Sequence, residues 1–403
     1  MLSHSKISAP SPGNSDAPSA RPNRDLDFAS FTSLFHATDN THLASTFRLG
    51  HALFDDLDDH LDRSVSSEIK RRVATLRRIN EVSSWLQRAV SATVDQELKA
   101  HSSSDASKLA FIHLTGNQIE KAVEVLIDGG DVRLATLVSQ YSGDPNFRND
   151  VHEQLQIWKS EKVDVFISDD MLRLYALGAG EVNVLQGNGS RNVEVSKGLD
   201  WLRAFGLQMW YCSAFDTSLR DSLEEYEERY KESKGTVAGP TPWYSKSQNR
   251  TTVTDGLFSL LKLALVTSIT LESTLVPLSF SPNPRDFSLC WFLYVLLSRS
   301  LGVRDFSDRR AILPSDDESM DGYYSTDGYS MTADVLTSNF ASQLEQEGLV
   351  QEAAFVLLFL EDDNGYVTFS VIVTFPFSFV TISQAETGNQ RPAGSVRAAV
   401  DRI

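Results

Sequence analysis

The sequence predicts an all-α fold in which many helices of about 10 to 30 residues, joined by short turns, form an irregular stack. Three observations lead to this prediction. Apolar residues recur at spacings of three and four along most of the chain. Glycine, proline and capping residues separate these segments, and no series of alternating strands is visible. No exact internal repeat occurs, so the stack is expected to be irregular.

Composition sets broad limits on function. The 403 residues include 54 acidic and 37 basic side chains, a formal net charge of −17, and 41% are hydrophobic, which is enough for a large core and excludes global disorder. The negative charge argues against non-specific nucleic-acid binding, although one local basic patch is still compatible with it. Two cysteines, Cys212 and Cys290, cannot form a disulfide framework or a four-thiolate metal site, which favours a reducing compartment. Residues 1–24 have no apolar core of the kind found in a secretory signal.

The chain begins with a Ser- and Pro-rich stretch. Residues 1–27 have little to bury, so we expect a disordered lead-in followed by a helical scaffold domain over 28–361. The clearest predicted helix spans 68–98. Its apolar side carries Ile69, Val73, Leu76, Ile79, Val82, Leu86, Val90 and Val94, and the opposite side carries Lys70, Arg71, Arg77, Arg78 and Arg88. Arg72 falls toward the apolar side and Trp85 toward the basic side. We interpret the basic stripe as a solvated or carboxylate-paired face, with a phosphate or partner site as the alternative.

Capping residues and glycines mark the next helices. Thr115 and Gln118 fit a capping box. Gly129-Gly130 is expected to end that helix, and Asp131 to cap the one that follows. Gly178 and Gly180 end a further helix that begins near residue 169. Later helices are predicted at 195–211, 218–231, 255–266, 285–301, 333–346 and 349–361.

One stretch has acidic residues but no basic ones. No Lys or Arg occurs between Arg310 and Arg391, while carboxylates gather between Pro314 and Asp334. We interpret residues 314–334 as a disordered acidic loop within the helical domain. A calcium loop is the alternative, but the carboxylates do not follow the spacing of the twelve-residue calcium-binding pattern.

The sequence shows no catalytic, cofactor-binding or metal site. All eight histidines lie at or before His152 and no two are three or four residues apart, so no helical turn can present a His pair to zinc. No phosphate-binding loop occurs, and Gly187-Asn188-Gly189 is interpreted as an isolated turn. Cys212 is expected to be a small core residue. The tryptophans are expected to anchor the core, except Trp243, which fits a surface role equally well.

A series of ordered motifs begins at His113. It consists of a Leu-(Ser/Thr)-Gly start, a Gly-Asp turn, an R-L-A-x-L-x-S-Q helix, a Trp-bearing helix and an R-L-x-x-Y-A-L-x-A-G helix. The residues that carry these and the later matches, all structural, are Leu114, Gly116, Gly130, Asp131, Arg133, Leu134, Gln140, Trp158, Arg173, Leu174, Tyr175, Gly180, Trp201, Trp291 and Gly348. The series resembles the family of the α-helical scaffold nucleoporin released as the C-terminal product of an autoproteolytic FG-nucleoporin precursor. This family shares the ancestral coatomer element with vesicle-coat scaffolds.

The resemblance implies a non-enzymatic scaffold without cofactors. Such a protein belongs to the Y-shaped outer-ring coat of the nuclear pore complex, on the nuclear envelope, and supports transport of protein and mRNA. Its helices would fold back as trunk, crown and tail, with a candidate crown at about residues 115–270 and truncation at both ends. Its partners would be other coat nucleoporins: a related helical scaffold bound through the crown, and a β-propeller protein that receives a donated blade. Partner-binding residues are not identified. A vesicle-coat scaffold and an enzyme with an unrecognised site are the alternatives.

Two segments depart from the family pattern. No three-strand blade precedes the helices, which puts the propeller contact in doubt. Residues 362–403 form an aberrant apolar segment and a short tail, and Tyr366 to Ile382 is uncharged with Pro376 inside it. We favour an intron translated in frame, because residues 395–400 resume a helical pattern. A membrane contact and a buried segment are the alternatives.

Overall fold

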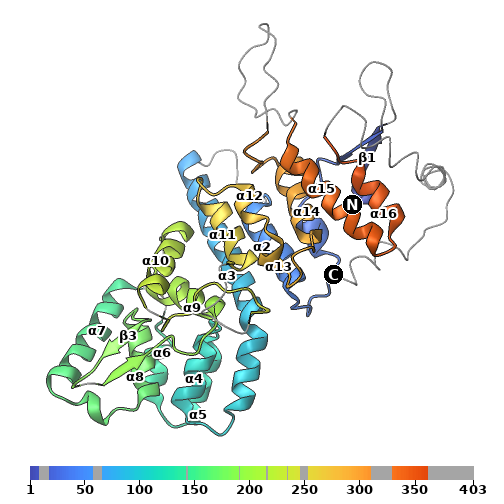
Figure 1. The fold of residues 1–403 in the computed structure, drawn as a ribbon. Coiled ribbons are helices and arrows are strands. Elements are labelled where there is room, and N and C mark those ends of the chain that lie inside the picture. The colour runs from blue at the N-terminus through green and yellow to red at the C-terminus, as the bar shows by residue number, and fades with distance from the viewer. Residues whose placement is uncertain are drawn as a thin grey trace. The chain divides into compact units, whose positions relative to one another are not determined.

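Helices dominate the fold (Figure 1). The computed structural model describes residues 1–8, 18–57, 66–141, 144–189, 191–214, 217–233, 235–245, 253–309 and 329–361. Within these residues there are sixteen α-helices and two small antiparallel sheets of two strands each, which confirms the all-α prediction. Most of the predicted acidic loop, residues 314–328, and the apolar segment 366–382 lie outside the described residues.

The chain divides into two units. Unit 1 comprises Met1–Ala37, Thr41–Asp55 and Ser259–Ile403, and unit 2 comprises Thr38–Asn40 and Asp56–Phe258. The chain therefore starts in unit 1, builds unit 2 and returns to unit 1, which is the path of a fold-back stack. The candidate crown at about 115–270 stays a prediction.

Unit 2 is a helical stack around one main core. Helices α4, α5 and α6 pack in sequence order, α7 packs on α8, and α9 packs on the long helix α3 (Figure 1). Leu114, Leu134, Leu174 and Tyr211 are among the buried side chains at its centre. The elements are α3 (Ser67–Ala100), α4 (Ala106–Leu114), α5 (Ile119–Asp128), α6 (Val132–Val138), α7 (Pro145–Ser160), the 3-10 turn η2 (Asp164–Phe166), α8 (Asp169–Gly178), β3 (Val184–Gln186), β4 (Asn192–Glu194), α9 (Trp201–Leu207), the π-helix η3 (Gln208–Cys212) and α10 (Leu219–Glu232).

The predicted helix at 68–98 is present as α3, which Ser66 caps by accepting a hydrogen bond from the Ile69 N–H. Only its C-terminal half is buried, and Ile69 in the first turn is 54% exposed. Trp85, which falls toward the basic side by helical position, is 5% exposed, and this burial confirms the expectation that it anchors the core. Both α4 and α9 pack on α3, so the buried face is wider than the stripe that a single helical contact requires.

The turn between α4 and α5 differs from the predicted capping box. Thr115 ends α4 instead of starting α5, and its hydroxyl donates to the Ile112 carbonyl at 2.6 Å. Gln118 precedes α5 without a side-chain cap, and its Oε1 lies 2.8 Å from His113 Nδ1. The next turn is as predicted. Gly130 has φ +83° after α5, and Asp131 accepts from the Leu134 N–H to cap α6.

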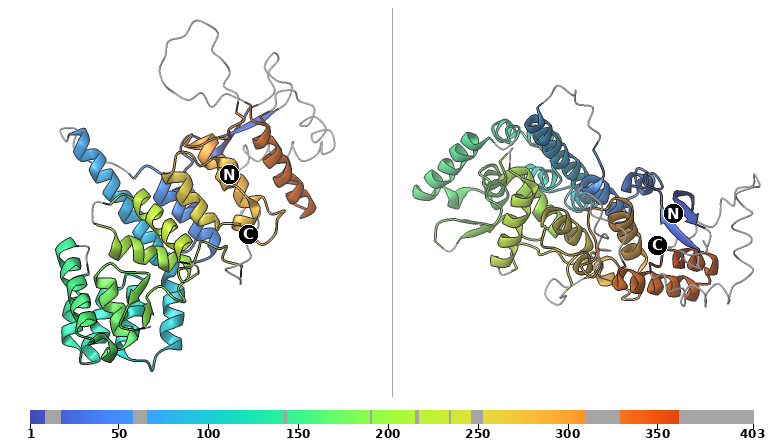
Figure 2. Two further views of the ribbon diagram at one scale, coloured as in Figure 1. Left: turned by 60° about the vertical axis from the view of Figure 1, so that its left-hand side comes forward. Right: turned by 90° about the horizontal axis from the view of Figure 1, so that it is seen from above.

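Unit 1 joins elements from both ends of the chain. Trp291 on α14 is central to it, with ring centroids 5.2 Å from Phe340 and 5.3 Å from Phe359. Helices α15 and α16, orange in Figure 2, pack against each other, and α15 also packs on α14. The elements are the 3-10 turn η1 (Leu2–His4), β1 (Ser5–Ser8), β2 (Ser19–Pro22), α1 (Phe28–Thr32), α2 (His42–Phe54), α11 (Gly256–Leu265, whose first three residues belong to unit 2), α12 (Leu271–Thr274), α13 (Pro277–Phe280), α14 (Ser288–Tyr294), the π-helix η4 (Val295–Ser300), α15 (Met331–Gln346) and α16 (Val350–Leu357).

The lead-in is not wholly disordered. Strands β1 and β2 pair antiparallel with Ser5 opposite Pro22 and Ser8 opposite Ser19, so the expectation of disorder over 1–27 is wrong for these residues. The Ala20 N–H also donates to the Leu358 carbonyl at 2.7 Å, which ties β2 to the end of α16. Backbone hydrogen bonds of this kind need no apolar side chains and leave no compositional signal.

Candidate partner-binding surface

Metal and thiol chemistry find little support in the part of the chain that the structure describes. Its His, Cys, Asp and Glu side chains form no group of three or more that could hold a metal ion. None of its helices has both the length and the apolar character that a membrane span requires. Burial raises the pKa of the Cys212 thiol to about 11 and also raises that of Cys290, so both thiols stay protonated at neutral pH.

The η2 turn of unit 2 exposes an aromatic side chain. Phe166 is 88% exposed, the highest value among the large hydrophobic side chains described. Val165 next to it is 48% exposed, and Ile157 in α7 is 42% exposed. In contrast, Trp158 and Ile167 on either side of the turn pack against a small apolar core. The chain thus half-buries Trp158 and Ile167 and leaves Phe166 in solvent.

A buried carboxylate holds this turn on one side. Asp164 is 4% exposed, and its oxygens accept hydrogen bonds from the Asn188 backbone N–H at 2.7 Å and from Asn188 Nδ2 at 2.6 Å. Asn188 Nδ2 also donates to the Lys159 carbonyl in α7. Burial raises the pKa of the Asp164 carboxyl, but the hydrogen bonds from Asn188 and the Val165 N–H, together with the charge of Arg191, outweigh that effect, so the pKa lies below its ordinary value.

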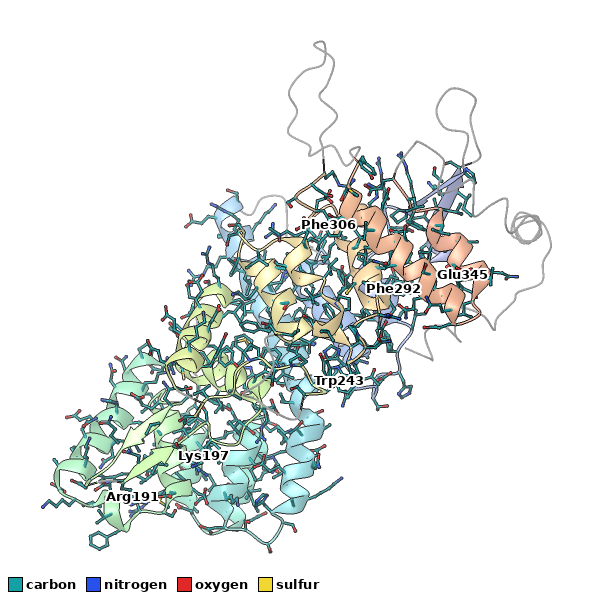
Figure 3. The ribbon with its side chains drawn as sticks, viewed as in Figure 1. Arg191, Lys197, Trp243, Phe292, Phe306 and Glu345 are labelled. Carbon is teal, nitrogen blue, oxygen red and sulfur yellow. The ribbon has the colours of Figure 1, made fainter. Side chains whose placement is uncertain are left out.

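A guanidinium group holds the turn on the other side. Arg191 lies between β3 and β4 and is labelled in Figure 3. Its guanidinium group donates hydrogen bonds to the carbonyls of Asp164 and Ile167. It also forms an ion pair with Asp169 at 2.5 Å. Because one rigid, planar group binds a carbonyl at each end of the turn, the backbone that carries Phe166 is defined before any partner arrives.

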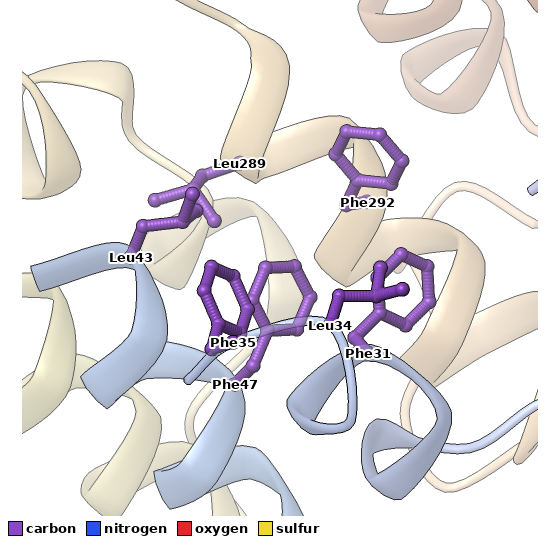
Figure 4. Close-up of a pocket in the computed structure, with 7 residues that line it drawn as sticks. All are labelled: Phe31, Leu34, Phe35, Leu43, Phe47, Leu289 and Phe292. Carbon is purple, nitrogen blue, oxygen red and sulfur yellow. The ribbon is translucent and has the colours of Figure 1, made fainter. Parts of the chain in front are cut away.

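Unit 1 has an apolar hollow between α1, α2 and α14 (Figure 4). Phe31 and Phe47 stack in it with ring centroids 4.8 Å apart, and Phe292 approaches Phe31 at 5.7 Å. Leu34 at its side is 59% exposed. No polar side chain lines it; the lining residues are Phe31, Leu34, Phe35, Leu43, Phe47, Leu289 and Phe292.

The residues that carry the family resemblance do not converge on one site. Leu114, Leu134, Leu174, Trp201 and Trp291 are buried core side chains. Gly130, Gly180 and Gly348 have positive φ values of 83°, 76° and 81° at helix ends. Five others make or flank side-chain contacts: Trp158 meets Tyr175 edge-on at 4.6 Å, Arg173 pairs with Asp170, Asp131 caps α6, and Gly116 follows the end of α4. Arg133 and Gln140 are exposed on or beside α6.

The η2 turn has no signature in the sequence. The prediction that Gly187-Asn188-Gly189 is an isolated turn is wrong, because Asn188 binds Asp164 across 24 residues of sequence. No local pattern links these two residues, so only a pairing detected between distant positions could have indicated the contact.

Comparison with known proteins decides the family. The family model described as "Nuclear protein 96" (Nup96) matches residues 108–370, which is more than half of the chain. The chain belongs to the Nup96 family. This confirms the resemblance seen in its motifs.

Relatives of this Nup96-family chain carry consistent names. It is 30% identical over 324 residues to "Nuclear pore complex protein Nup98-Nup96" of Drosophila melanogaster, which covers 79% of this chain and 15% of the relative. It is 28% identical over 318 residues to "Nucleoporin nup189" of Schizosaccharomyces pombe, a match that covers 77% of this chain and 17% of the relative. It is 28% identical over 361 residues to "Nuclear pore complex protein NUP96" of Arabidopsis thaliana, a match that covers 86% of this chain and 31% of the relative. The chain thus spans from about a seventh to a third of the length of these relatives.

Proposed function

We propose that this chain is a structural component of the nuclear pore complex, located in the coat at the nuclear envelope, where it supports transport of protein and mRNA. The observation that carries the proposal is the family match over residues 108–370, together with relatives named as nuclear pore proteins. A helical stack with apolar surface features in both units suits a scaffold that packs against neighbouring proteins.

Other nucleoporins would be its partners. We infer that unit 2, which contains most of the candidate crown, contacts a related helical scaffold. A β-propeller protein that receives a donated blade is the second partner that we propose. Within the described residues, β1 and β2 pair with each other and the Ala20 N–H binds the Leu358 carbonyl, so these two strands are engaged within the chain. Catalysis forms no part of the proposal.

The test is localisation of a tagged full-length chain together with purification of its complexes. We expect a signal at the nuclear rim and stoichiometric recovery of other nucleoporins. Recovery with vesicle-coat proteins on cytoplasmic membranes would favour the vesicle-coat alternative. Turnover of a small molecule that is lost on Cys212→Ser or on substitution of a carboxylate would overturn the scaffold role.

A further inference from the structure

We propose that the η2 turn is a preformed anchor by which unit 2 docks Phe166 into an apolar pocket between helices of a partner protein. The inference rests on the proposed function, because the partner is taken to be another structural component of the same assembly. It adds the side chain that makes the contact and the chemistry of the surface that receives it.

Phe166 is held in solvent although its exposure does not stabilise the fold. An exposed phenyl ring in water gains nothing for the folded chain, and at 88% exposure Phe166 contributes almost no burial to unit 2. Yet the turn is held by a buried carboxylate, an amide and a guanidinium, those of Asp164, Asn188 and Arg191. A turn without these contacts would be free to rotate its apolar residues inward. The network therefore keeps Phe166 outward.

The backbone of the η2 turn is already fixed in the unbound chain. A side chain on a defined backbone loses little conformational freedom on binding, so more of its burial energy appears as affinity. Aromatic side chains with this property are typical anchors of protein interfaces. Val165, 48% exposed and adjacent in sequence, provides an apolar neighbour for the rim of the pocket.

Charge identifies the kind of partner. Residues 159–173, together with Arg191, which binds the turn, contain equal numbers of basic and acidic side chains. The basic ones are Lys159, Lys162, Arg173 and Arg191, and the acidic ones are Glu161, Asp164, Asp169 and Asp170. An anionic membrane surface or a nucleic acid would require an excess of positive charge here. An apolar pocket on a protein requires none. We therefore infer a protein surface with a slot for one phenyl ring, such as the groove between two packed helices.

The first experiment places a photo-crosslinking phenylalanine analogue (p-benzoylphenylalanine) at position 166 of the full-length chain in cells. The matched control carries it at Ile127, which is in the same unit and 51% exposed. We expect one dominant adduct from position 166, with another helical nucleoporin, and none of that species from position 127. An adduct with a second copy of this chain, equal adducts from both positions, or no adduct would overturn the proposal.

The second experiment measures the affinity of the purified full chain for the nucleoporin found in that adduct. Phe166→Ala should weaken binding roughly 30-fold, as truncation of an interface anchor does, whereas Ile127→Ala should change it less than about twofold. Arg191→Met keeps the ring but frees the turn, and a loss of roughly 2- to 10-fold is expected. Unchanged affinity for Phe166→Ala would disprove the anchor. So would Phe166-dependent sedimentation of the chain with vesicles that contain 30% phosphatidylserine, since it would identify a membrane as the ligand.

These outcomes are separate from the proposed function. A chain that reaches the nuclear rim and binds other nucleoporins without Phe166 is a nuclear pore component with its contact elsewhere. A chain that never reaches the rim fails the proposed function, whatever the crosslinks show.

Discussion

Arg203 on α9 and Glu97 on α3 form an ion pair inside unit 2, although 106 residues separate them in sequence. Arg203 is 2% exposed, and its other donors, Nε and Nη2, reach the Thr115 hydroxyl at 2.9 and 2.5 Å. One buried guanidinium therefore ties α9 to α3 and to the end of α4. This contact also explains why Thr115 does not cap α5: its hydroxyl oxygen is engaged by Arg203.

Arg203→Met should destabilise unit 2 by about 2 kcal/mol, because it leaves the buried Thr115 hydroxyl and the half-buried Glu97 carboxylate without their donor. The measurement is urea denaturation of the full chain followed by tryptophan fluorescence. Arg220→Met is the control, since Arg220 pairs with Glu224 at 2.8 Å on the surface and its loss should leave the midpoint unchanged. Equal effects of the two substitutions would contradict the role given to Arg203.

Leu137→Pro should disrupt α6 and lower stability by about 3 kcal/mol or more, because proline removes a helical hydrogen bond and its ring collides with the preceding turn. Val132→Pro provides a matched control in the same helix. Val132 is the first helical residue after the Asp131 cap, where proline is tolerated. Thermal denaturation and recovery of partners check both variants, and survival of Leu137→Pro would show that α6 is misplaced.

Gly50→Ala should destabilise unit 1 by about 1–3 kcal/mol through overpacking. A Cβ at position 50 would lie 2.2 Å from two ring carbons of Phe28, which is fully buried and stacks on Phe54 with centroids 5.8 Å apart. Combining Gly50→Ala with Phe28→Leu makes room at that point. The double variant should therefore lose less stability than the sum of the two single losses, and simple additivity would argue against the collision.

Cys212 should resist alkylation in the folded chain. Burial raises the pKa of this thiol to about 11, so at pH 8 the thiolate fraction, and with it the rate with iodoacetamide, should be more than about 100-fold below that of free cysteine. The pKa is raised, so reactivity should grow only as the pH approaches 11. Mass spectrometry before and after unfolding in urea provides the comparison. Rapid labelling of Cys212 at pH 7 in the native chain would revive the thiol-enzyme alternative.

Local signals were sufficient for much of the fold. The Asp131 cap and the Gly130 stop depend on residues within a few positions, and both were predicted correctly. The long helix α3 followed from periodicity alone. Contacts between distant positions had no local signal: α4 and α9 both pack on α3, and Asp164 binds Asn188 in another turn.

The sequence by itself determined the helical class, most turns and the family, because helix periodicity, capping and ordered motifs are written in neighbouring residues. The tertiary structure alone decided that only the C-terminal half of α3 is buried, that residues 5–8 and 19–22 pair as strands, and that Phe166 is held in solvent. Each of these features depends on which distant residues pack against a helix or form hydrogen bonds with a given backbone or charged group. The order of residues along the chain does not contain that information.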